Sequence, residues 1–231
     1  MRQDPVSEAE ATRGPDQINP AFFNRFERYA EDASSDDLRQ RWGRILAGEI
    51  RKPGRFSQKV LRIVDELEPD LALLFEEKCK YLFAEVWPRA LVGDLSFHDQ
   101  ARLTHAGLLT EPGLGQARSF NRITTEQGAP VDSWILYLGD FAIAIPTSTE
   151  LAIESLSLPN EETLLVWNDD KTPGIPVYVL TAAGSAISTI LPNRSRAAFQ
   201  EYASIIRDFV GDSVISLELI QGTRNYKAFG T

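Results

Sequence analysis

The stretch Trp134–Ile145, which reads WILYLGDFAIAI, determines the fold class that we expect for this chain. Aromatic and β-branched residues on both sides of Gly139-Asp140 are typical of two strands, and a glycine-containing pair between them favours a two-residue hairpin turn. Segments of similar composition follow or precede it at 118–124, 177–180 and 214–220. The sequence therefore predicts a mostly antiparallel sheet in this half of the chain.

Helical patterns surround these predicted strands. Apolar residues recur with the period of a helix in three segments: 96–106, 181–191 and 195–210. Three shorter segments are additional candidate strands: 108–110, 151–158 and 163–167. We therefore expect residues 89–222 to form an α+β domain in which helices flank the sheet. The order of helix 96–106 and hairpin 134–145 also fits a winged-helix pattern, although Arg102 is the one dependable base of that helix.

The chain before Trp87-Pro88 has a different pattern, with apolar residues at helical spacing. Asn19-Pro20 can begin a first helix, and Ser34 with Asp37 has the capping-box spacing for a second. Ser57 can cap a third, and Pro69 can open a fourth whose apolar stripe continues to Val86. Residues 20–88 are thus predicted to be a four-helix bundle, with polar tails at 1–19 and 223–231.

Composition limits the class of protein. The chain has 231 residues, 43% hydrophobic and 25% charged, which excludes a mostly disordered chain and a collagen. The single cysteine, Cys79, cannot form an intrachain disulfide. The acidic N-terminus lacks the apolar stretch of a signal peptide, and no apolar run reaches the roughly 18 residues of a membrane span. We therefore expect a cytoplasmic protein with no membrane partner.

The main charge anomaly lies between residues 39 and 62, where eight basic residues accompany a single acid, Glu49. This segment carries a net charge of +7 in a chain whose net charge is −9. Such a cluster beside a helix N-terminus can bind phosphate groups. The candidate polyanion-binding residues are Arg44, Arg51, Lys52, Arg55, Lys59 and Arg62. Alternatively, the segment docks against acidic surfaces of its own chain or of a second copy, or simply faces solvent.

No catalytic or metal-binding pattern is present. His98 and His105 are seven residues apart on one predicted helix, so about 10.5 Å of helical rise separates them and they cannot share a metal ion. A nuclease-like string begins at Pro69-Asp70 and continues with Glu76 and Lys78, but all four residues fall on one helix. We therefore assign no catalytic residue, no metal ligand and no cofactor.

Residues 38–57 read LRQRWGRILAGEIRKPGRFS and resemble an uncharacterised bacterial family, a domain of unknown function, with a Trp followed by LAGEI and PGxFS. The matching residues are Trp42, Leu46, Ala47, Gly48, Glu49, Ile50, Pro53, Gly54, Phe56 and Ser57. The resemblance implies no activity. We expect structural roles: Trp42 and Phe56 packing across the Pro53-Gly54 turn, Gly48 admitting another helix, and Ser57 capping the next one. A weaker likeness to abortive-infection proteins implies phage defence.

Three hypotheses follow for function. The first is a non-enzymatic interaction or sensor module with a protein partner or a second copy of the chain, and it rests on the missing catalytic constellations. The second is a nucleic-acid binder that uses the basic segment. The third is a hydrolase or nuclease whose site is assembled across the two halves, for which a carboxylate cluster near Glu49 would be the sign.

Overall fold

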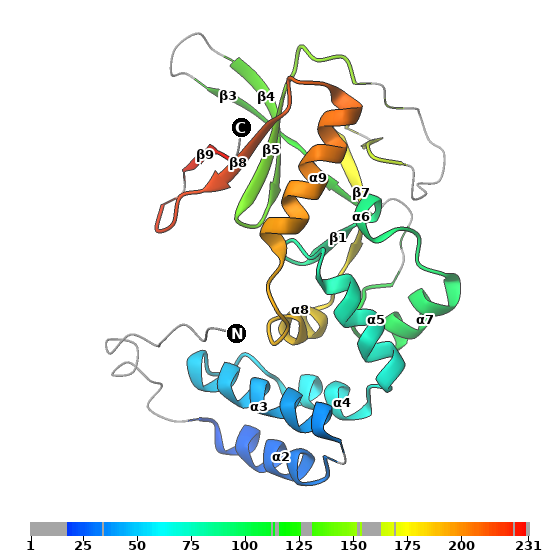
Figure 1. The fold of residues 1–231 in the computed structure, drawn as a ribbon, viewed down its shortest axis with the longest axis vertical. Coiled ribbons are helices and arrows are strands. Elements are labelled where there is room, and N and C mark those ends of the chain that lie inside the picture. The colour runs from blue at the N-terminus through cyan, green and yellow to red at the C-terminus, as the bar shows by residue number, and fades with distance from the viewer. Residues whose placement is uncertain are drawn as a thin grey trace.

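A computed structural model describes residues 18–33, 35–111, 113, 116–125, 131–151, 153, 163–168, 170–223 and 225–229 of the chain. Over these residues the protein is α+β, with eight helices and with strands that pair in antiparallel fashion (Figure 1). The predicted fold class is confirmed at this level. The first four helices lie at one end of the molecule, and the larger sheet lies at the other end.

The four N-terminal helices form in the expected places: α2 (Pro20–Glu31), α3 (Asp36–Arg51), α4 (Gln58–Glu66) and α5 (Pro69–Cys79). Their caps explain where they begin. The Asn19 side chain accepts from the N–H of Ala21, and Ser57 Oγ accepts from the N–H of Val60. The cap of α3 is Ser35, whose Oγ accepts from Leu38 N–H, whereas the expected cap, Ser34, lies outside the described residues.

These helices do not enclose a core by themselves. Their buried residues join one hydrophobic cluster with α7 (Phe97–His105), α8 (Ala182–Ser188) and the end of β7 (Pro173–Val179). Members from both parts of the chain include Phe22, Trp42, Val64, Phe75, Leu103, Tyr178 and Ile187. A separate four-helix bundle is therefore not confirmed, and the domain boundary at residues 88–89 stays a prediction.

The fourth helix is shorter than we expected. It ends at Cys79, the chain turns with Ala84 at a φ of 54°, and Val86–Pro88 forms strand β1. β1 pairs with β7 in the register Trp87↔Tyr178. The expectation of one helix to Val86 was wrong because Phe83 and Val86 are buried in a turn and a strand, and burial alone does not distinguish these from a helical stripe.

The strands form two sheets. The smaller has the order β1-β7-β2, with β6 also on β7, and the larger has the order β3-β4-β5-β8-β9. The remaining strands are β2 (Ala117–Ser119), β3 (Asn121–Thr125), β4 (Val131–Leu138), β5 (Phe141–Pro146), β6 (Val166–Trp167), β8 (Ile215–Leu219) and β9 (Tyr226–Ala228). The predicted hairpin is confirmed, because Leu138 pairs with Phe141 across Gly139-Asp140 and Gly139 has a φ of 68°. Residues 223–231, expected to fray, instead contain β9.

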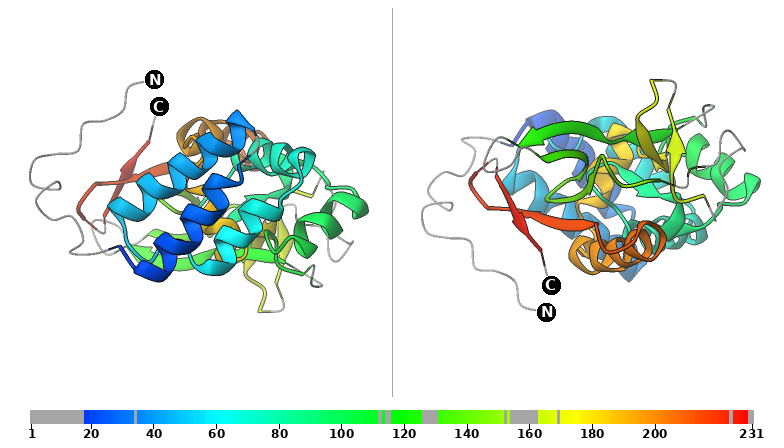
Figure 2. Two further views of the ribbon diagram at one scale, coloured as in Figure 1. Left: turned by 90° about the horizontal axis from the view of Figure 1, so that it is seen from below. Right: turned by 90° about the horizontal axis from the view of Figure 1, so that it is seen from above.

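The long helix α9 (Ser195–Val210), confirmed at its predicted bounds, packs against the larger sheet (Figures 1 and 2). The rings of Phe141 and Phe199 stack with centroids 4.6 Å apart. A short helix, α6 (Arg89–Val92), follows β1. Of the additional candidate strands, 108–110 contributes one isolated bridge, Leu109↔Leu180, and 151–158 falls almost entirely outside the described residues. No helix in the described part of the chain is long and apolar enough to cross a membrane.

Candidate nucleic-acid interface

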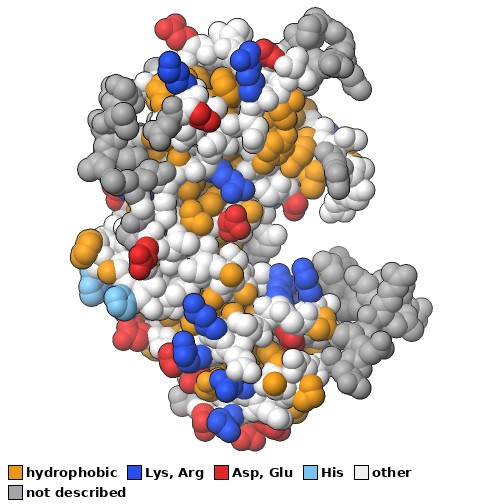
Figure 3. Space-filling view, turned by 180° about the vertical axis from the view of Figure 1, so that it is seen from behind, with side chains coloured by type: hydrophobic (Ala, Val, Ile, Leu, Met, Phe, Trp, Pro, Cys, Tyr) orange, Lys and Arg blue, Asp and Glu red, His pale blue; other side chains and the backbone are white. Residues whose placement is uncertain are grey.

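The six candidate cations occupy the last turns of α3, the loop that follows it, and α4. We call them the basic surface: Arg44, Arg51, Lys52, Arg55, Lys59 and Arg62. All are exposed except Arg44, which is half-buried. Figure 3 shows Lys and Arg side chains spread over the helical half of one face of the molecule, with some beside the hollow that separates it from the sheet half. The position of these side chains therefore permits contact with a large partner.

A buried carboxylate holds the loop between α3 and α4, which presents two of these cations, Lys52 and Arg55. Glu49 is 1% exposed, and its Oε1 accepts from Gly54 N–H at 2.6 Å while its Oε2 accepts from Phe56 N–H at 3.1 Å. Gly54 has a φ of 77°, a conformation that glycine adopts at low cost. A lone acid among eight basic residues suggests an ion pair with a neighbouring arginine. The structure shows instead that this acid fixes the backbone of the loop from inside.

The other motif residues complete the same structural unit. A Cβ added at Gly48 would lie 2.8 Å from Cε2 of Phe56, so Gly48 makes room for this ring rather than for another helix. Trp42 stacks on Tyr29 and meets Phe26 edge to face, and it belongs to the same buried cluster as Phe56. Ser57 then caps α4. The motif therefore builds the turn from which the basic surface projects.

The pairing of the cations distinguishes two groups. Arg44 donates to Oε1 of Gln40 at 2.9 Å, and Arg62 lies 3.9 Å from the Glu66 carboxylate. The side chains of the remaining four, Arg51, Lys52, Arg55 and Lys59, form neither an ion pair nor a hydrogen bond with any residue that the structure describes. An intramolecular dock onto acidic surface, one of the alternatives from the sequence, finds no support in these contacts.

Arg102, the basic residue of the predicted recognition helix, already pairs with two acidic residues. Arg102 on α7 donates to Glu68 Oε2 at 2.6 Å and to Asp70 Oδ2 at 2.7 Å. The hydrogen bond from Arg102 lowers the pKa of Asp70 below its usual value, and both acids raise the pKa of Arg102. Arg102 thus ties α7 to the start of α5. This pairing gives no support to a winged-helix mode of DNA binding.

Other candidates for chemistry are also accounted for by structure. Within the described ranges, no group of three or more His, Cys, Asp or Glu residues could hold a metal ion. The Cys79 thiol is buried, and this burial raises its pKa far above the usual range. Lys78, part of the nuclease-like string, donates to the carbonyl of Val92. Asp70 of the same string is bound to Arg102, so these residues do not converge on a site.

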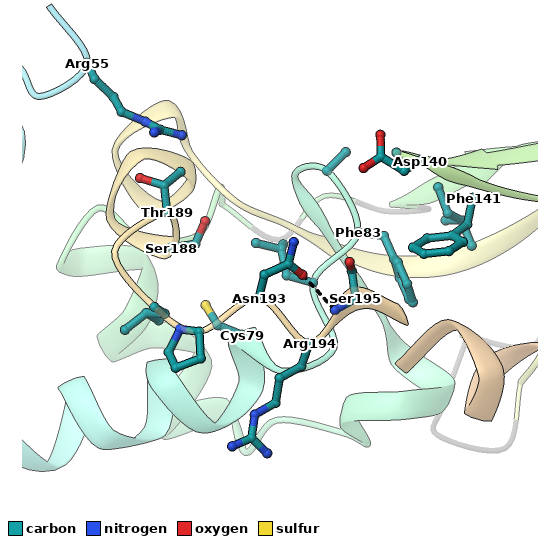
Figure 4. Close-up of a pocket in the computed structure, with 16 residues that line it drawn as sticks. Arg55, Cys79, Phe83, Asp140, Phe141, Ser188, Thr189, Asn193, Arg194 and Ser195 are labelled. Carbon is teal, nitrogen blue, oxygen red and sulfur yellow. Dashed lines mark hydrogen bonds between the residues drawn. The ribbon is translucent and has the colours of Figure 1, made fainter. Parts of the chain in front are cut away.

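A pocket of about 430 Å³ lies between the helical half and the larger sheet (Figure 4). Arg55 of the basic surface contributes to its wall, and so do the β4–β5 turn and the segment between α8 and α9. Its polar residues are Arg55, Asp140, Ser188, Thr189, Asn193, Arg194 and Ser195. Sequence reasoning selected Arg55 alone from this set. The others lie in the β4–β5 turn, at the end of α8 and in the segment up to the start of α9, and no spacing in the sequence indicates that the fold brings them near Arg55.

Comparison with known proteins finds a family match for the N-terminal part of the chain. Residues 5–86 match the model of a family described as a protein of unknown function (DUF2806). This confirms the expected resemblance to a domain of unknown function, and the matched region includes the whole basic surface and the Glu49 loop. The specific motif and the likeness to abortive-infection proteins stay predictions. No curated protein and no solved structure matches the chain.

Proposed function

We propose that the chain is a non-enzymatic binding module whose partner is a nucleic acid held on the basic surface. One observation carries this proposal: Arg51, Lys52, Arg55 and Lys59 are exposed and lack acidic partners among the described residues. Contacts from such cations to phosphates position a strand without reading its sequence. We therefore expect binding that depends weakly on base sequence and strongly on salt.

The charge of the whole chain supports a single binding face. The net charge is −9, so surfaces outside the basic segment repel a polyanion overall. The Glu49 carboxylate and the Ser57 cap hold the loop and the start of α4, so the cations are presented from a fixed backbone. Preorganisation of this kind reduces the entropy lost on binding. A protein partner with an acidic surface is the rival proposal, and the experiment below separates the two.

Fluorescence anisotropy with labelled single-stranded and double-stranded DNA and RNA tests the proposal. If Arg51, Lys52, Arg55 and Lys59 each contact one duplex phosphate, raising salt from about 50 to about 200 mM should weaken binding by about 150-fold. Single strands should lose roughly 50-fold over the same range. Absence of binding to all four probes at the lower salt concentration would contradict the proposal and favour a protein partner.

We further propose phage defence as the biological setting, which rests on the predicted likeness of the helical half to abortive-infection proteins. A bacterial host that expresses the chain should then yield fewer phage plaques than the same host expressing a variant in which Arg51, Lys52 and Arg55 are alanine. Equal plaque numbers with both forms, at equal protein levels, would contradict this setting while leaving the binding proposal standing.

A further inference from the structure

The larger sheet has two faces of different composition, and its register assigns each side chain to one of them. Phe141 stacks on Phe199 of α9, so Phe141 and its register partners face that helix (Figures 1 and 2). Because side chains alternate between the faces along each strand, the charged residues of the five strands all fall on the α9 side. They are Arg122, Asp132, Glu218 and Lys227. We call the opposite side the uncharged face, because none of its described side chains is charged. It consists of every second residue along the strands, starting from Asn121, Ser133, Ala142, Ile215 and Tyr226.

The uncharged face is also apolar and lies outside the core of the protein. On β4, β8 and β9 its large side chains are Ile135, Tyr137, Ile215, Leu217, Leu219 and Tyr226. None of these six belongs to either hydrophobic cluster of the described residues, whereas Leu136 and Ile143, on the α9 side of the same sheet, do. Ile215 is 48% exposed. An antiparallel sheet with one face toward water normally carries polar residues on that face, so an uncharged apolar face indicates a further contact.

Two tyrosines give the middle of this face a fixed shape. The rings of Tyr137 and Tyr226 lie 5.5 Å apart, although β5 and β8 lie between their strands. Both rings therefore lean over the centre of the sheet, where Ala142, the register partner of Tyr137, is 0% exposed. The Tyr226 hydroxyl donates to the carbonyl of Gly139 at 3.2 Å, which holds its ring in place. Aromatic side chains fixed in this way are typical of the buried centre of a protein interface.

We infer that a second copy of this chain docks on the uncharged face, so that the two sheets pack face to face about a two-fold axis. A nucleic acid or a charged peptide finds no side chain of opposite charge there. The same face of a second copy offers an uncharged apolar surface of equal extent, and in a two-fold dimer the same patch meets itself. Sheets packed in this way lie about 10 Å apart. This docking does not depend on nucleic-acid binding, because the basic surface belongs to helices at the other end of the molecule (Figure 1).

The area of the uncharged face determines how strong this dimer can be. Five strands about 4.8 Å apart, each contributing up to about five residues at about 3.4 Å, outline roughly 400 Å² per copy. Two copies would therefore bury about 800 Å² of flat outline, and the relief of the side chains makes the accessible area larger than this. Stable, specific interfaces bury about 1,200–2,000 Å² in total. The face thus suffices for a weak dimer, with an expected dissociation constant on the order of 10–100 µM.

Sedimentation equilibrium at about 5 to about 500 µM brackets this constant, and the mass should rise from that of one chain toward that of two. Ile215→Lys places two charges in a symmetric interface, one from each copy, and should weaken the dimer about tenfold or more. Ala228→Lys, at an exposed position of the same face, should also weaken the dimer, and it serves as a second variant if Ile215→Lys fails to fold. Phe209→Lys is the matched control. Phe209 is 43% exposed on α9 and the net charge changes equally, so the dimer should persist.

Three results would overturn the dimer. The first is the mass of one chain at every concentration, which would favour a different occupant of the uncharged face. The second is association that neither Ile215→Lys nor Ala228→Lys weakens, because the contact would then lie elsewhere on the molecule. The third is equal weakening by Phe209→Lys, because net charge and not this face would then control association. None of these results bears on nucleic-acid binding, which the anisotropy measurements test separately.

Discussion

Glu49→Gln tests whether a buried carboxylate holds the basic surface in place. The wild-type side chain is 1% exposed and accepts two backbone N–H bonds, one with each oxygen. In the variant, one oxygen becomes an NH₂ group that faces an N–H donor. The bond to Phe56 N–H is buried, whereas that to Gly54 is partly exposed, so water can replace the latter at lower cost.

The expected loss follows from these two bonds. A hydrogen bond to a charged group contributes about 1.5–3 kcal/mol, so losing one and weakening the other should cost about 2–3 kcal/mol in the free energy of unfolding. For a chain of this length, that corresponds to a fall in Tm of roughly 4–12 °C. No cation is removed, yet affinity for nucleic acid should also fall because the loop that follows Arg51 and carries Lys52 and Arg55 loses its fixed backbone.

Urea unfolding at neutral pH measures the change directly, with the m-value as a check that the unfolded state is unaltered. Glu201→Gln is the matched control, because Glu201 is an exposed residue of α9 and the same substitution there should change stability by less than about 0.5 kcal/mol. If Glu49→Gln lowers the free energy of unfolding no more than Glu201→Gln does, the Glu49 carboxylate does not stabilise the loop. The structural role that we assign to the motif would then be wrong.

Two further changes test packing and charge. Gly48→Ala should lower the free energy of unfolding, measured in urea, by about 1–3 kcal/mol, because the new Cβ would lie 2.8 Å from the Phe56 ring. Gly43→Ala is the control: its Cβ would have nothing within 4 Å, so the change should be neutral or stabilising. Equal effects of the two substitutions would contradict the packing of Phe56 against Gly48. The pKa of Asp70 is lowered by Arg102, so this pair contributes stability above the unfolded pKa of about 3.9, and the contribution is lost as pH falls through the folded pKa. Wild type should therefore lose more stability than Asp70→Asn between pH 5 and pH 2, and parallel pH profiles of the two proteins would contradict this.

The sequence predicted well what local chemistry determines. The Asn19 and Ser57 caps, the Gly139-Asp140 hairpin and the bounds of α9 all depend on residues within a few positions of each other. The strand at Val86–Pro88 was missed because its partner, β7, lies far along the chain. A three-residue buried strand carries too short a pattern to differ from the last turn of a helix.

For the candidate site, too, the sequence predicted the features that depend on neighbouring residues and missed the others. The six cations were visible as a cluster because they lie within one short segment. The role of Glu49 was missed because an acid among arginines suggests an ion pair, and the sequence gives no sign that backbone N–H groups five and seven residues later reach it first. The pocket was missed because Arg55, the β4–β5 turn and the segment between α8 and α9, which line it, lie far apart in the sequence.

The salt dependence of duplex DNA binding tests the central claim most directly. The slope of log affinity against log salt should be shallower by about 2.7 when Arg51, Lys52 and Arg55 are replaced with alanine, because three phosphate contacts are lost. A control that replaces Arg122, Arg207 and Lys227, on β3, α9 and β9, changes net charge equally away from the basic surface and should leave the slope unchanged. Equal slopes for wild type and the first variant would contradict the claim that the basic surface contacts the nucleic acid.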